Sequence, residues 1–328
     1  MPLKAAGLRY PHQRTFLPRT KLAYVHLRNL LTDAKRDRAA RVFGYVAIWM
    51  PEELLILYMQ EGEVVNAVST VDGAAFEVVP VAEAVARVPT EPEFGEVAFH
   101  EADDEQLACM FQTQTTPPEP WPDELRASDA RALFPFLAAT IFDGTVELAL
   151  DRAMSYLVVR DGTVQRAFLA DDQPGAVVDR VKRLFLQEAR RASSTVVRRW
   201  PVAPPLPAQA PAALVQAYRE LGAALVKRLV AEGGDATPMI ADYARHLLMP
   251  SHPSLASHAF DGRNGVRLPT VDSTTFTRAI AAWMTEVLWA MTPETLSQED
   301  LLRDLTRPRR HMFQAAGLYD QLPWRVDW

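Results

Sequence analysis

Residues 44–68 read GYVAIWMPEELLILYMQEGEVVNAV, and residues 144–168, one hundred positions later, read GTVELALDRAMSYLVVRDGTVQRAF. Aligned without a gap, the two stretches are identical at six positions, and most other positions pair one apolar residue with another. The identical pairs are Gly44/Gly144, Val46/Val146, Leu57/Leu157, Gly62/Gly162, Val64/Val164 and Ala67/Ala167. Self-similarity at a fixed distance is typical of an internal repeat. We therefore expect a duplication, in which one α+β module occurs twice.

Each stretch predicts a three-stranded antiparallel meander. β-Branched and aromatic residues favour extended backbone. Asp161-Gly162 predicts a tight turn because glycine accepts a positive φ without steric cost, and Glu61-Gly62 is a weaker form of the same signal. The expected strands are 45–50, 54–59 and 63–69 in the first copy, and 145–150, 155–160 and 163–169 in the second.

Helical periodicity surrounds both meanders. The expected helices are 22–41, 81–88 and 104–112 around the first copy, and 128–139 and 176–192 around the second. Pro135 predicts a kink or a restart in helix 128–139, because proline lacks the backbone donor. Further strands are expected at 95–100 and 194–200. Apolar stripes predict a helix over 214–229, another over 276–288, and a third that starts at Thr292-Pro293.

The predicted fold class is α+β, with two repeated modules, each a three-stranded antiparallel meander plus helices, followed by a mainly α-helical C-terminal domain. Two proline-rich segments, TTPPEPWP at 115–122 and PVAPPLPAQAP at 201–211, predict exposed linkers because proline stiffens the chain and removes a donor. The expected divisions are a basic N-terminal arm 1–21, a first module 22–114, a linker 115–122, a second module 123–200, a linker 201–211 and a helical domain 212–328.

The repeated motif, with the order helix, G-x-V, apolar strand, acidic-Gly turn and strand ending in Ala, resembles the PATAN domain. That domain is named for the N-terminal region of a cyanobacterial regulator of heterocyst pattern formation. Gly95-Glu96-Val97-Ala98-Phe99 resembles its closing strand, whereas the second copy has Ser194-Thr195-Val196-Val197 instead. The likeness covers residues 22–112 and 125–200 and implies a non-catalytic bacterial signalling module, often joined to receiver domains. No receiver-like acidic cluster is found in this sequence.

Charge is distributed unevenly along the chain. Residues 1–41 carry ten Lys or Arg and two Asp or Glu, a net charge of +8, whereas residues 42–130 carry two basic and 18 acidic residues, a net charge of −16. Such separation can steer a charged partner, or the basic segment can fold onto the acidic one. The single cysteine, Cys109, excludes an internal disulfide and suits a reducing compartment. No membrane span or secretory signal is expected, so we predict a cytoplasmic protein.

Motifs for catalysis and cofactors are absent: the sequence has no G-x-G-x-x-G, no phosphate-binding loop, no H-E-x-x-H and no G-x-S-x-G. We therefore expect no catalytic residues and no cofactor. The weak candidates for a metal site are His246, His252 and His258, whose spacing of six places no two of them on one helical face. The carboxylate pairs of the sequence are expected to lie in solvent.

Two surfaces are candidates for interaction: a basic cluster on the first helix and an aromatic tail. Their residues are Lys35, Arg36, Arg38, Arg41, Trp324 and Trp328. The tail tryptophans are expected either to fold back on the protein or to anchor a partner. The sequence thus favours a signalling or scaffold protein that acts through protein–protein contacts, with homo-oligomerisation left open. The alternatives are a nucleic-acid-associated protein that uses clustered Arg and Lys, and a metal-dependent enzyme in the C-terminal region.

Overall fold

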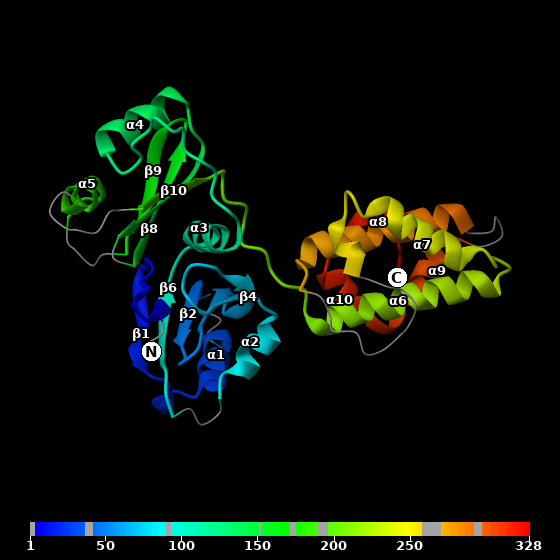
Figure 1. The fold of residues 1–328 in the computed structure, drawn as a ribbon. Helices are drawn as coiled ribbons and strands as arrows, with labels where there is room; N and C mark the ends of the chain where they lie inside the picture. Colours follow the sequence, from blue (N-terminus) through cyan, green and yellow to red (C-terminus); the bar gives the residue numbers. More distant parts are fainter. Residues whose placement is uncertain are drawn as a thin grey trace. The chain divides into compact units, whose positions relative to one another are not determined.

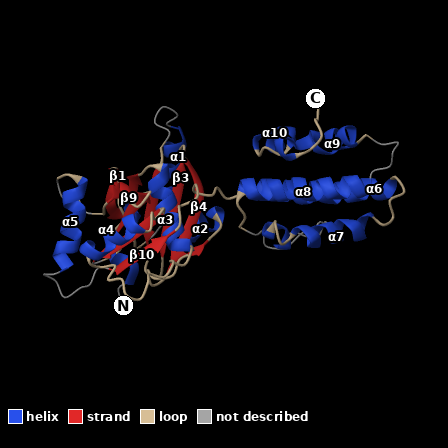
Figure 2. Cartoon of the chain, turned by 90° about the horizontal axis from the view of Figure 1, so that it is seen from above, coloured by secondary structure: helices blue, strands red, loops and turns tan. Residues whose placement is uncertain are grey.

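The computed structural model describes residues 4–36, 42–89, 93–150, 152–170, 175–188, 196–257, 270–291 and 297–328. The chain divides into two compact units, Met1–Pro207 and Ala208–Trp328. The architecture is mixed α+β with two antiparallel sheets, and both sheets belong to the first unit (Figure 1). In Figure 2, which colours helices blue and strands red, the labelled strands all belong to the first unit, whereas the labelled elements of the second unit are helices. Among the described residues, no helix has the length and apolar character needed to cross a bilayer.

The first sheet has the strand order β1-β6-β2-β3-β4-β5, with antiparallel neighbours throughout. Its strands are β1 (Arg14–Lys21), β2 (Gly44–Trp49), β3 (Leu54–Gln60), β4 (Glu63–Thr70), β5 (Glu77–Val78) and β6 (Glu96–Glu101). The expected meander is formed by β2, β3 and β4. Its second turn places Glu61 at φ 51° and Gly62 at φ 80°, the positive φ pair that a tight hairpin requires.

The second sheet has the order β10-β7-β8-β9. Its strands are β7 (Gly144–Leu150), β8 (Ala153–Arg160), β9 (Thr163–Phe168) and β10 (Val196–Trp200). Its pairing follows that of the first sheet at a distance of one hundred residues, since Gly44 pairs with Met59 and Gly144 with Val159. Each sheet also has a register shift at the same place, after Tyr58 in β3 and after Val158 in β8.

Eight residues of the basic N-terminal segment, Arg14–Lys21, form strand β1 of the first sheet. β1 pairs antiparallel with β6, a strand of the acidic region. Arg19 lies 2.6 Å from Glu96 and 4.2 Å from the centroid of the Trp49 ring. The charge pattern left two alternatives open: the basic segment could steer a partner or fold onto the acidic region. Residues 14–21 fold onto the acidic region.

Five helices cover the two sheets: α1 (Leu27–Arg36), α2 (Val81–Arg87), α3 (Asp104–Thr115), α4 (Ala130–Ala139) and α5 (Val177–Glu188). Helices α1 and α2 cover one face of the first sheet, and α4 and α5 cover one face of the second. Helix α3 packs against both sheets, because Leu107 and Met110 share one core with Tyr45 of β2 and Tyr156 of β8. The two sheets are therefore joined through a common helix.

Several expected helix boundaries are wrong. The helix expected from residue 22 begins as a short 3-10 turn, Leu22–Tyr24, and α1 starts at Leu27. Residues 37–41 lie outside the described part. Helix α4 is capped by Asp129, whose side chain accepts from the backbone N–H of Arg131, and it continues through Pro135. Proline has no backbone N–H, so at this position it removes one intrahelical hydrogen bond. The loss is near the N-terminus, where the first N–H groups of a helix have no intrahelical acceptor in any case.

The proline-rich segment 115–122 and residues 201–207 of the second one belong to the first unit, whereas residues 208–211 belong to the second unit. The backbone N–H of Glu119 donates to the carbonyl of Arg199 on β10 at 2.8 Å, and the indole of Trp121 donates to Val197 at 2.9 Å. Leu206 is 6% exposed and packs into the core around α3. The amide of Asn66 donates to the carbonyl of Pro207 at 2.8 Å. Residues 119–121 and 201–207 are thus held in place and are not free linkers, because proline keeps its carbonyl acceptor and its apolar ring.

In the second unit the described residues form α6 (Ala212–Ala231), α7 (Thr237–Leu248), α8 (Ser273–Met291), α9 (Gln298–Thr306) and α10 (Arg310–Ala315). Short 3-10 turns of this unit are Pro253–Ser257, Arg307–Arg309 and Tyr319–Gln321, and the first unit has another at Lys4–Gly7. The core of this unit contains Tyr218, which stacks on Phe313 with ring centroids 5.3 Å apart, and Trp283, whose indole donates to Ala241 at 2.9 Å. The expected helix start at Thr292-Pro293 lies outside the described residues, and α9 is capped by Ser297.

Candidate functional site

The second sheet ends in a strand with one open edge. β9 pairs with β8 and stands last in the strand order. The counterpart of β9 in the first sheet is β4. Strand β5 covers the outer edge of β4, with Val68 paired to Val78. Positions 177 and 178, one hundred residues after β5, begin helix α5 instead. Within the part of the chain that the structure describes, β9 has no strand on its outer side.

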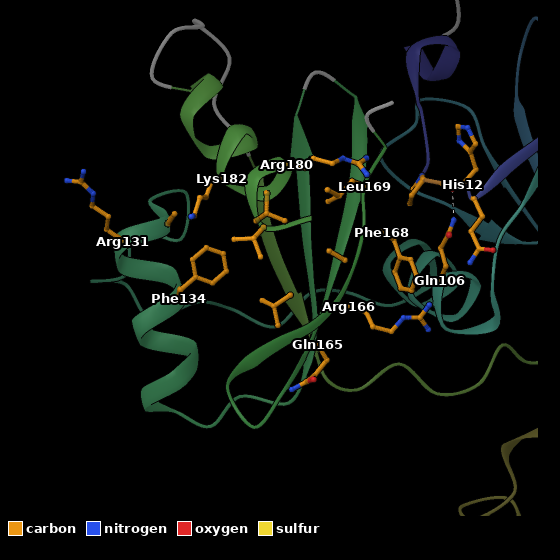
Figure 3. A pocket seen from close by; sticks show the side chains of 17 residues that line it. His12, Gln106, Arg131, Phe134, Gln165, Arg166, Phe168, Leu169, Arg180 and Lys182 are labelled. Atoms are coloured by element: carbon orange, nitrogen blue, oxygen red, sulfur yellow. Dashed lines mark hydrogen bonds between the residues drawn. The ribbon is translucent and has the colours of Figure 1, made fainter. Parts of the chain in front are cut away.

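A groove of about 1050 Å³ runs beside this edge. Helices α4 and α5 line one wall, segment 11–13 and Gln106 of α3 line the other, and β9 lies between them (Figure 3). The side-chain amide of Gln106 donates to the carbonyl of Pro11 at 2.5 Å, which ties the N-terminal segment to α3. The groove is therefore assembled from parts of the chain that are far apart in sequence.

Side chains of β9 alternate between the two walls, because successive strand residues point to opposite faces of a sheet. Ala167 and Leu169 belong to the core beneath α4 and α5. Phe168 belongs to the core around α3. The guanidinium of Arg166 lies 4.8 Å from the centroid of the Phe168 ring and shares its side of the strand. An occupant of the groove would therefore meet two chemically different faces.

The charged groups that line the groove are cations, and none of the described lining residues is Asp or Glu. The cations are Arg131 on α4, Arg180 and Lys182 on α5, and Arg166 on β9. Arg166 is already neutralised, since it donates to Asp103 and, at 3.0 Å, to Glu105 at the start of α3. On the α4–α5 wall, Arg131 and Lys182 add positive charge to the lining (Figure 3).

The lining offers groups for binding. No described lining residue carries a hydroxyl, thiol or carboxylate, the side chains that most often act as nucleophiles. His12 is the single histidine of the described lining, and its ring centroid lies 4.4 Å from that of His100. Guanidinium, ammonium, amide and apolar groups remain, together with the backbone of β9. These groups can hold a charged or extended ligand by hydrogen bonds and Coulomb attraction.

The structure does not bring the three candidate metal ligands together among the residues it describes. His246 lies on α7, with Nδ1 2.8 Å from the carbonyl oxygen of Asp242. His252 lies in the turn that follows α7, where its backbone N–H donates to Leu248. His258 lies outside the described residues. Across the described ranges, no three His, Cys, Asp or Glu side chains are grouped so as to hold a metal ion.

The expected basic cluster is described only in part. Lys35 and Arg36 are the last two residues of α1, whereas Arg38 and Arg41 lie outside the described residues. Two other cations that the sequence offers to a nucleic acid, Arg198 and Arg309, are paired within the protein. Arg198 lies 2.8 Å from Glu147, and Arg309 lies 2.5 Å from Glu220.

Both tail tryptophans contact their own unit. The ring centroid of Trp324 lies 6.0 Å from that of Trp289. Trp328 lies 5.5 Å from Tyr319, and the guanidinium of Arg310 lies 4.5 Å from the centroid of the Trp328 ring. The tail is therefore engaged with the protein's own surface, although 43% of Trp328 remains exposed.

Cys109 and Glu147 are buried ionisable groups that lie outside the groove. Cys109 of α3 is 1% exposed, and burial raises the pKa of its thiol to about 11, so the thiol stays protonated at neutral pH. Glu147 of β7 is 5% exposed, and burial raises the pKa of its carboxyl although Arg198 opposes the shift. Glu147 does not belong to the carboxylate pairs that were expected in solvent. Its burial was not predicted from sequence, because it depends on α3 packing across the second sheet.

No family model, curated protein or solved structure matches this chain. Function is therefore inferred from its own residues.

Proposed function

We propose that this chain is a non-catalytic bacterial signalling or scaffold protein that binds another protein through the groove along β9. The observation that carries the proposal is an open strand edge inside a cation-lined groove. Unpaired strand edges accept extended segments of other chains, with main-chain hydrogen bonds for affinity and side-chain contacts for specificity. Natural proteins usually shield such edges, so an edge left open between two walls favours a binding role.

We further propose that the two sheets are duplicated PATAN-like modules, one of which has kept its edge covered. The conserved distance of one hundred residues supports this, since it holds for the meander pairs and extends to β6 and β10. Close contacts of two glycines support it as well. A Cβ at Gly44 would lie 2.0 Å from the carbonyl oxygen of His100 on β6, and one at Gly144 would lie 2.1 Å from that of Trp200 on β10.

In this proposal residues 212–328 form a helical domain that carries an effector or dimerisation surface. The support is an exposed apolar stripe on α7, where Met239, Tyr243 and Leu247 recur at intervals of four residues and are 71%, 67% and 57% exposed. Residues at this spacing share one helix face. Large exposed apolar residues on one face are typical of interaction sites.

The test is capture of partners by the purified full chain from a bacterial lysate, followed by titration of each captured protein against the chain by calorimetry. A saturable complex of fixed stoichiometry that persists with modest loss at raised salt supports the proposal. The proposal fails if no protein binds saturably and nucleic acid binds instead, with an affinity that falls steeply as salt rises.

A further inference from the structure

We infer that β9 accepts an extended peptide as an added strand, and that this peptide carries acidic side chains toward α4 and α5 and apolar side chains toward Phe168. The inference rests on the proposed function and specifies its ligand: a segment of a partner protein in which acidic and apolar residues alternate.

The backbone of β9 is oriented to receive such a strand. In the first sheet Ala67 pairs with Leu57, and its carbonyl points outward, where it accepts from the backbone N–H of Val79 at 3.0 Å. In the second sheet Ala167 pairs with Leu157 in the same register. In an antiparallel ladder the donor and acceptor of one residue point to the same side. The N–H and C=O of Ala167 therefore face the groove, and those of Leu169 follow at a period of two.

The dimensions suit a short peptide. β9 comprises six residues, and at about 3.3 Å per residue its edge can pair along about 20 Å. Both walls stand beside this edge, so side chains of an added strand would fall alternately on one wall and the other.

The charge of each wall sets the preferred side chains. Arg131 on α4 and Lys182 on α5 add positive charge to the described lining of the α4–α5 wall, so carboxylates of the peptide are attracted there. On the opposite wall Arg166 already binds Asp103 and Glu105. The other described lining residues on that side are Pro11, His12, Gln13, Gln106 and Phe168. The apolar members, Pro11 and Phe168, favour an apolar residue there. A second copy of this chain is the weaker occupant, because pairing two β9 edges would bring the same cations together.

The experiment measures fluorescence anisotropy of labelled eight-residue peptides with the full chain. One peptide alternates Glu with Val, a second alternates Lys with Val, and a third is the Glu peptide with N-methylated backbone at alternate positions. The protein variants are Lys182→Glu, Ala167→Pro and Lys227→Glu. Lys227→Glu is the matched control, since Lys227 is likewise an exposed lysine within a helix and is absent from the groove.

We expect saturable binding of the Glu peptide alone. Lys182→Glu weakens it by roughly tenfold, because one attraction becomes a repulsion, whereas Lys227→Glu leaves it unchanged. Ala167→Pro abolishes binding, because proline removes an outward donor while the pairing of β9 with β8 keeps its hydrogen bonds. An unchanged circular dichroism spectrum and melting temperature show that this variant folds. The N-methylated peptide provides the same test on unaltered protein, and it fails to bind.

The inference is overturned by equal binding of the Glu and Lys peptides, by binding of the N-methylated peptide, or by an unchanged affinity of Lys182→Glu. Self-association of the chain that Ala167→Pro abolishes assigns the edge to a second copy and also overturns it. So does an oligonucleotide that displaces the Glu peptide and binds more tightly. If a captured protein binds Lys182→Glu and Ala167→Pro with the same affinity as wild type, this inference is overturned and the proposed function still stands. Failure to capture any protein counts against the proposed function and leaves the peptide result to be judged separately.

Discussion

Replacing Arg198 by alanine measures how far the second sheet depends on one buried charge. Glu147 on β7 is 5% exposed and lies directly opposite Arg198 on β10. The Nε of Arg198 is 2.8 Å from Oε1 of Glu147. Burial raises the pKa of Glu147, and the nearby guanidinium is the largest influence in the opposite direction. Without Arg198 the carboxylate loses the charge that best offsets its desolvation.

Breaking a buried ion pair by removing one partner costs about 3–5 kcal/mol. The side chain of Arg198 is 39% exposed, so water screens part of the interaction, and we expect Arg198→Ala to cost about 2–3 kcal/mol. In a Glu147→Gln background no buried charge is left unpaired. There the same replacement should cost less than about 1 kcal/mol, which gives a coupling energy of at least about 1–2 kcal/mol.

The assay is a double-mutant cycle at pH 7, read by hydrogen exchange of peptides that cover β7 and β10 at increasing urea. Site-resolved exchange is needed because the two units need not unfold together. Equal costs of Arg198→Ala in the wild-type and Glu147→Gln backgrounds, within about 0.5 kcal/mol, would refute the reasoning. That result would mean that water hydrates the carboxylate in the folded protein.

Three further predictions follow from the same structure. The folded protein binds a proton at Glu147 more tightly than the unfolded chain does, because burial raises the pKa of this carboxyl above 4.5. The free energy of unfolding of the second sheet should therefore fall as pH rises from 4.5 through the raised pKa. In Glu147→Gln the plot of unfolding free energy against pH should be flatter. Gly44→Ala and Gly144→Ala each place a Cβ within 2.1 Å of a carbonyl oxygen on the neighbouring strand, and each should cost at least about 2 kcal/mol in urea denaturation; a loss below about 0.5 kcal/mol at either position contradicts the close contact. Cys109, whose thiol pKa is raised to about 11, should resist a soluble thiol reagent at about pH 8 in the folded protein and react after denaturation; rapid labelling of the native chain would show that α3 opens readily.

The two meanders could be predicted from sequence because local signals fix them. β-Branched and aromatic residues favour the strands, and Asp161-Gly162 supplies the positive φ pair at the turn, with φ of 49° and 71°. These signals act within a few residues of each other. The ends of helices were less predictable. Helix 128–139 was expected to start with Ser128 as its cap, whereas Asp129 caps it in the structure, and Ser and Asp are about equally good cap residues.

The groove could not be predicted, because its walls come from residues 11–13, 106, 130–134 and 178–182. Nothing in the sequence of β9 predicts that no further strand pairs with its outer edge. That outcome depends on residues 177 and 178, which start helix α5 although their counterparts Glu77 and Val78 form a strand. Valine suits either conformation, so tertiary packing decides.

The sequence by itself determined the strand and turn pattern, its recurrence after one hundred residues, and the opposite charges of the first two segments. These properties depend on backbone preference and composition, which short stretches of chain express without the rest of the protein. Only the tertiary structure decided that α3 serves both sheets, that the proline-rich segments pack against them, and that Glu147 is buried. Burial and edge exposure depend on what lies on the far side of an element, and that neighbour is supplied by residues remote in the chain.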